Sequence, residues 1–139
     1  MRGVLLLLLT SCLGSQGRSV EPGGRCQSDD GCGGGEVCAR NSHCYELSDI
    51  RAVQVTWTVA GEPADATTCS ESPNLEIDFQ TGRDLDDDLG FAPVPCVSGK
   101  FSIDKLPLDF TRVRLGSNRL GFQSGTLDRA TGELQLDLR

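Results

Sequence analysis

Cysteine is the residue type in this chain with the most chemistry to offer, since seven of its 139 residues are cysteines. Four of these, Cys26, Cys32, Cys38 and Cys44, recur at every sixth position. Thiols in the cytosol are kept reduced, so a density this high indicates disulfides formed in an oxidising compartment. Zinc ligands usually lie two to four residues apart, and the wider spacing argues against a zinc site.

The four regularly spaced cysteines allow three pairings, which the spacing alone leaves open. We favour Cys26–Cys38 with Cys32–Cys44, because interleaved bridges tie a short segment together from both of its ends. Residues 26–45 contain very few apolar side chains, so disulfides and not a core must hold this segment. The segment resembles the C-x5-C-x5-C-x(4-5)-C modules that follow the tether in many exported bacterial proteins.

The N-terminus has the features of an export signal. Arg2 supplies the positive charge, and residues 3–9 form an apolar run. A membrane-spanning helix needs about 20 apolar residues, so this shorter run predicts a signal peptide and not a membrane span. We assign the signal peptide to residues 1–11.

The seventh cysteine, Cys12, directly follows this signal. Residues 9–12 read Leu-Thr-Ser-Cys and resemble the lipobox of bacterial lipoproteins. The resemblance implies that Cys12 is lipidated, with acyl chains such as palmitate, and begins the mature chain. It also implies the outer membrane or cell surface, because residue 13 is Leu and not Asp. The alternative is an unlipidated periplasmic or secreted protein whose signal is cleaved near Gly17.

The rest of the chain divides by composition into a tether and a β body. Residues 12–25 are rich in Gly, Ser and Pro and predict a flexible tether. From residue 50 onward, apolar and polar residues alternate, which is the period of strands with one face in water. Six or seven short strands separated by turns predict a mainly β fold, an antiparallel sandwich or small barrel over residues 50–139. The apolar positions are Val53, Val55, Trp57 and Val59; Leu75, Ile77 and Phe79; Phe101 and Ile103; Val113 and Leu115; Leu120 and Phe122; and Leu134, Leu136 and Leu138.

Two further features belong to this body. Residues 128–132 lie between two apolar runs, and we expect them to form the tip of a hairpin.

Cys69 and Cys96 have only each other left as partners once the other cysteines are assigned. A Cys69–Cys96 bridge would add on the order of 3–4 kcal/mol in the chain-entropy model. It would join the two sheets or hold the acidic loop.

A resemblance to a known fold is found in residues 55–69 and 95–115. The first run leads from a strand through Trp57 to Cys69, and the second leads from Cys96 through Leu106-Pro107 into a strand. This pattern resembles the prealbumin-like (carboxypeptidase-regulatory-like) β-sandwich domains of bacterial lipoproteins. The resemblance implies a fold and a role as a spacer or binding platform, and it implies no chemistry.

Asp84, Asp86 and Asp88 form the one acidic cluster in which we consider a metal. Carboxylates at alternate positions can converge on Ca²⁺, as in D-x-D-x-D-G loops. Here Leu89 stands where the turn glycine belongs and Pro95 where the bidentate glutamate belongs. We therefore expect a solvated acidic loop and no cofactor. A weak calcium site, serving a calcium- or glycan-binding adhesin, is the alternative.

Neither catalysis nor nucleic-acid binding is expected. His43, the single histidine, lies in the cystine-rich segment, where we expect a solvated loop residue and not a catalytic base. A net charge of −7 repels phosphate backbones. We expect a lipid-anchored binding or structural module of the cell envelope, not an enzyme, whose partner is an envelope protein or a glycan. Protease inhibition through residues 26–45 is an alternative.

Overall fold

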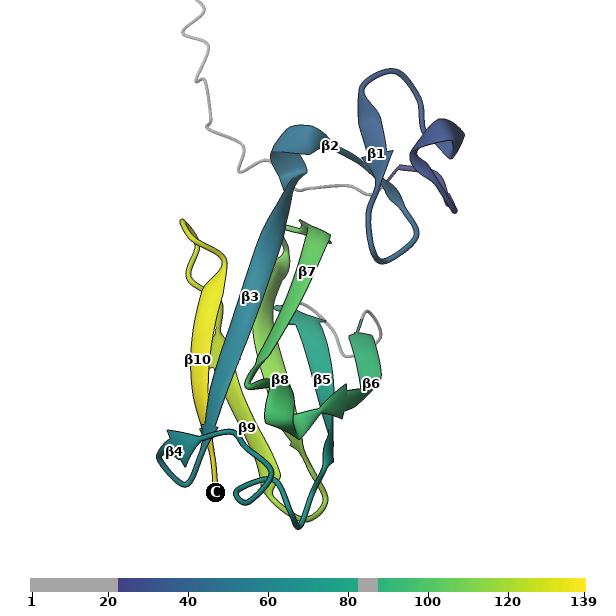
Figure 1. Cartoon of the computed structure of the whole chain (residues 1–139). Helices are drawn as coiled ribbons and strands as arrows, with labels where there is room; N and C mark the ends of the chain where they lie inside the picture. Colours follow the sequence, from purple (N-terminus) through teal and green to yellow (C-terminus); the bar gives the residue numbers. More distant parts are fainter. Residues whose placement is uncertain (1–22, 83–87) are drawn as a thin grey trace, which may run out of the picture.

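The computed structural model describes residues 23–82 and 88–139. The protein is mainly β, as the alternation of apolar and polar residues predicted, and the described residues contain strands and 3-10 turns but no α-helix. A small disulfide-bonded module stands at one end of a body made of two sheets, and the C-terminus lies at the opposite end (Figure 1).

The N-terminal module is a short hairpin with one 3-10 turn packed beside it. Its elements are η1 (Asp29–Gly31), β1 (Glu36–Cys38) and β2 (Cys44–Glu46). Strands β1 and β2 pair antiparallel. The disulfides are Cys26–Cys38 and Cys32–Cys44, the pairs favoured from the spacing. The turn η2 (Leu47–Asp49) then leads directly into the body.

The body is a β-sandwich of two sheets. The first, which we call the β3 sheet, consists of β10 (Glu133–Leu138), β3 (Ile50–Val59) and β7 (Lys100–Pro107), with the short β4 (Glu62–Pro63) at the end of β3. The second, the β5 sheet, has the order β6 (Leu89–Pro95), β5 (Asn74–Thr81), β8 (Phe110–Ser117) and β9 (Gly121–Thr126). All pairs are antiparallel except β10 with β3, which is parallel.

The core lies between the two sheets and is made by alternate residues of each strand. Val53, Val55, Trp57 and Val59 of β3 are all buried, while Gln54 between them is exposed. Strands β5, β6, β7, β8 and β10 also contribute buried residues. The remaining buried apolar residues of the core are Leu75, Ile77 and Phe79; Val94; Ile103 and Leu106; Phe110, Val113 and Leu115; Leu127; and Leu136 and Leu138.

Two expectations about the C-terminal strands are wrong. Residues 128–132 form a turn but not a hairpin tip, because β9 pairs with β8 while β10 crosses to pair with β3 in the other sheet. Phe122 does not join the apolar core: it lies on the outer face of the β5 sheet, where the Arg114 guanidinium carbon sits 3.5 Å from its ring centre. Gly125 occupies the inner position instead, where a Cβ atom would lie 2.7 Å from Leu134. The two sheets therefore approach closely along β9 and β10.

The third disulfide joins two of the connections that cross between the sheets of the sandwich. Cys69 lies between β4 and β5, and Cys96 begins the turn η3 (Cys96–Ser98) between β6 and β7. Each of these connections carries the chain from one sheet to the other. Both cysteines are buried. The bridge thus ties the sheets together at the end of the sandwich away from the module (Figure 1).

Candidate functional site

The residues singled out from the sequence do not gather into one site among the described residues. Cys12, Asp84 and Asp86 lie outside the described ranges. Asp88 is exposed, and one of its carboxylate oxygens accepts a hydrogen bond from Gln80 Nε2 at 3.2 Å. His43 is half-buried, not fully solvated as expected, with its Nδ1 3.0 Å from the Asn41 carbonyl oxygen. The sulfur atoms of Cys26, Cys32 and Cys44 lie close together, but each belongs to a disulfide and offers no thiolate to a metal.

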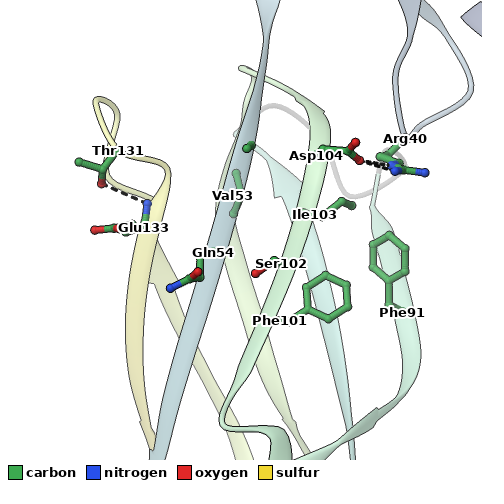
Figure 2. Close-up of a pocket in the computed structure, with 11 residues that line it drawn as sticks. Arg40, Val53, Gln54, Phe91, Phe101, Ser102, Ile103, Asp104, Thr131 and Glu133 are labelled. Atoms are coloured by element: carbon green, nitrogen blue, oxygen red, sulfur yellow. Dashed lines mark hydrogen bonds and ion pairs between the residues drawn. The ribbon is translucent and has the colours of Figure 1, made fainter.

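A groove of about 640 Å³ runs across the β3 sheet. Figure 2 shows it passing from the turn before β10, over β3 and β7, to the ring of Phe91 on β6. Its lining residues are Arg40; Ala52, Val53 and Gln54; Phe91; Phe101, Ser102, Ile103 and Asp104; and Thr131 and Glu133. The lining is polar in the middle and aromatic at the β6 end.

The aromatic end of the groove exists because the two sheets differ in width. The β3 sheet has three long strands, whereas the β5 sheet has four. Strand β7 faces β5, with the ring centres of Phe101 and Phe79 6.0 Å apart. Strand β6 lies beyond β5 and has no strand of the β3 sheet in front of it (Figure 1). Its inward residue Phe91 is therefore only half-buried, and its ring contacts Phe101 at 5.2 Å between centres.

Strand β7 is the edge of the β3 sheet along this groove. Antiparallel strands alternate residues whose backbone groups face the partner with residues whose groups face away. The Trp57 N–H donates to the Gly99 carbonyl oxygen at 3.0 Å, which fixes this alternation. Given the register of Val55 with Phe101, the backbone groups of Phe101 face β3 and those of Ser102 face away. No other described strand pairs with β7 on that side.

The module closes one end of this edge. The backbone N–H of Arg40 donates to the Lys105 carbonyl oxygen at 3.1 Å. The Arg40 guanidinium also pairs with the Asp104 carboxylate, and Lys105 Nζ lies 2.7 Å from an oxygen of Asp29. Among the residues that the structure describes, the part of the edge without a pairing strand therefore runs from Lys100 to Asp104.

Hydrogen bonds hold the acidic partners of this junction in the charged state. The pKa of the Asp104 carboxyl lies below its ordinary value, chiefly because the Arg40 side chain donates to it. The pKa of the Asp29 carboxyl is lowered by hydrogen bonds from Lys105 and from the Cys38 backbone N–H. These groups are occupied in joining the module to the body. None of the residues that line the groove is a histidine or a cysteine.

The opposite end of the groove is a rigid turn. The Asp128 carboxylate accepts hydrogen bonds from the backbone N–H groups of Ala130 and Thr131, both at 2.8 Å. These bonds lower the pKa of Asp128. Gly132 follows with φ +71°, and a Cβ atom there would lie 2.5 Å from the Ala52 carbonyl oxygen. Thr131 and Glu133 are held in place beside β3 by this turn.

Sequence reasoning missed the groove because it missed β6. No strand was predicted between Phe79 and Phe101, a stretch in which Pro93 and Pro95 each lack the N–H of a paired strand. In the structure, β6 is an edge strand, which tolerates proline. The signal that could have found it is the spacing of Leu89 and Phe91, which lie on one face opposite Phe79 and Ile77.

Comparison with known proteins finds no family model, no curated protein and no solved structure that matches this chain. Within residues 23–82 and 88–139, no helix has the length and apolar character needed to cross a membrane. The site must therefore be interpreted from its own geometry.

Proposed function

We propose that this chain is a lipid-anchored, non-catalytic binding module of the bacterial cell envelope. The observation that carries the proposal is the use of the cysteines. Six of the seven form three disulfides in the described residues. The seventh, Cys12, is the cysteine that closes the lipobox-like sequence, and no disulfide partner is left for it.

The disulfides support an exported protein. Three bridges in a chain of this size are expected in an oxidising compartment. The module has few apolar side chains to hold it, so its fold depends on the two bridges within it. A reducing cytosol would remove that support.

The position of the module supports attachment through its end of the molecule. The first described residue, Gly23, donates its N–H to the Cys44 carbonyl oxygen at 2.9 Å, so the chain enters the fold along β2. The C-terminus lies at the far end of the sandwich (Figure 1). An anchor at Cys12 would hold the module toward the membrane and leave the groove along β7 accessible from the side. We assign the sandwich to the prealbumin-like class on residues 55–69 and 95–115, as a binding platform.

Metabolic labelling tests the anchor. The full chain is expressed in a Gram-negative host with radiolabelled palmitate, and we expect label on the protein in the membrane fraction. The Cys12→Ala variant should carry no label. Cys69→Ala is the matched control, because it removes one disulfide cysteine and leaves the anchor in place. Label that persists in Cys12→Ala, or an unlabelled wild type, would contradict the proposal.

A further inference from the structure

We propose that the edge of β7 binds a single extended peptide segment of another protein, which adds a fourth long strand to the β3 sheet. This inference rests on the proposed binding role and names the partner's chemistry. A β-strand is recognised through its backbone hydrogen-bonding groups, and its alternate side chains enter pockets on the receiving surface.

The backbone of β7 offers the first half of this recognition. The N–H and carbonyl groups of Ser102 face away from β3, and by the same alternation so do those of Lys100 and Asp104. Native proteins usually blunt or cover an edge of this kind. Within residues 23–82 and 88–139, the backbone bond that covers this edge is the one at Lys105, where the Arg40 N–H already makes the kind of bond that an added strand would continue.

The aromatic end of the groove offers the second half. Neighbouring strands lie about 4.8 Å apart in a sheet, so a strand added beside β7 would lie over β6. Its inward side chains would cover the half-buried rings of Phe91 and Phe101. The sandwich would then have four strands facing four. The free stretch Lys100–Asp104 would match a segment of about five residues at roughly 3.3 Å each.

The same overhang excludes a second copy of this chain as the occupant. In each copy β5 lies behind β7, and β6 projects beyond β7. If two copies paired through their β7 strands, β5 of one copy would therefore have to occupy the space that β6 of the other copy already fills. A lone strand without a second sheet behind it meets no such obstacle. The groove therefore selects an extended segment over another sandwich.

A pair of N-methylated peptides tests the inference on the purified mature protein in detergent. The probe is a heptapeptide of alternating valine and threonine with a lysine at each end. The proposed segment pairs antiparallel with β7, so valines that face Phe91 and Phe101 leave the threonine N–H groups directed at β7. Methylation of the threonine amides removes these donors, whereas methylation of the valine amides alters only the solvent edge.

We expect the unmodified and valine-methylated peptides to shift the amide resonances of Lys100 to Asp104 and to slow hydrogen exchange at Ser102. The threonine-methylated peptide should bind at least about tenfold more weakly.

Phe91→Ala should weaken binding of the unmodified peptide about fivefold through lost apolar contact. The control Phe122→Ala, on the outer face of the other sheet, should leave binding unchanged.

Equal affinities for the two methylated peptides, or no shift at the solubility limit of the unmodified one, would overturn the inference. The comparison of peptides does not depend on how well any variant folds. The protein can equally be taken from a soluble fraction, so failure of the lipid anchor and failure of strand binding remain distinguishable.

Discussion

The indole Nε1 of Trp57 donates a hydrogen bond to the carbonyl oxygen of Cys96 at 2.9 Å. Trp57 comes from the middle of the β3 sheet, and Cys96 lies in the crossover that leaves the β5 sheet. Both are buried, and Cys96 is also bridged to Cys69. One side chain of the core is thus joined to the connection that the third disulfide holds.

Replacing Trp57 separates its two contributions. Trp57→Ala should lower the free energy of unfolding by about 3–5 kcal/mol through loss of the buried ring. Trp57→Phe keeps an aromatic ring but leaves the Cys96 carbonyl without its donor, and part of the loss should remain, about 1–3 kcal/mol. Urea denaturation measures both. A loss below about 1 kcal/mol for Trp57→Ala would show that the ring is not part of the core.

Reduction should affect the module before the body. The module has two disulfides and little apolar packing, whereas the sandwich has a continuous apolar core. With a reducing agent, amide hydrogens of residues 26–46 should exchange rapidly while those of β3, β5 and β8 stay protected. Hydrogen exchange followed by mass spectrometry measures this. Simultaneous loss of protection in both parts would contradict the independent stabilisation of the sandwich.

Gly116 should tolerate no side chain. A Cβ atom there would lie 2.0 Å from the carbonyl oxygen of Gly121 and 2.7 Å from the Phe122 Cα atom, both on the backbone of β9. Its φ of +157° is also one that residues with a side chain rarely adopt. Gly116→Ala should therefore destabilise the protein by about 2–3 kcal/mol. Gly34→Ala, where no atom lies within 4 Å, is the control and should change the melting temperature little.

Acid should loosen the contact between module and body. The pKa values of Asp29 and Asp104 are lowered in the fold, mainly by hydrogen bonds from Lys105 and Arg40 respectively. The two carboxylates contribute fully to the stability of this contact above the pKa of aspartate in the unfolded chain, about 4. This contribution is lost as the pH falls through the lowered pKa values of the folded protein. The amide resonance of Arg40, bonded to Lys105, should report the loss. A resonance that moves in the same way in an Asp29→Asn, Asp104→Asn double variant would contradict the assignment.

Most of the core could be predicted from the sequence, because apolar and polar residues alternate along any strand that has one buried face and one face in water. The buried positions of β3, β5 and β8 follow directly from that rule. It could not place Phe122, because Arg114 stacks on this ring and gives an apolar residue a stable place outside the core. It also could not pair β10 with β3, since the partner of a strand depends on contacts far apart in the chain.

The groove was beyond prediction for a related reason. It arises from the difference in width between two sheets, and no single segment encodes that difference. Phe91 is an apolar residue of the kind that usually lies in a core. It is half-buried because β7 is the last strand of the opposite sheet and does not cover it. Asp84, Asp86 and Cys12 lie outside the described residues, and calcium binding and lipidation at these positions stay predictions.

The intact mass of the mature protein, extracted from membranes of a Gram-negative host, tests the central claim most directly. We predict the mass of residues 12–139 plus diacylglyceryl and acyl groups, less the six hydrogens of the three disulfides. Reduction should add those six hydrogens and leave the lipid mass in place. A mass without lipid, for a chain that begins after residue 12, would contradict the anchor and make this a soluble exported protein.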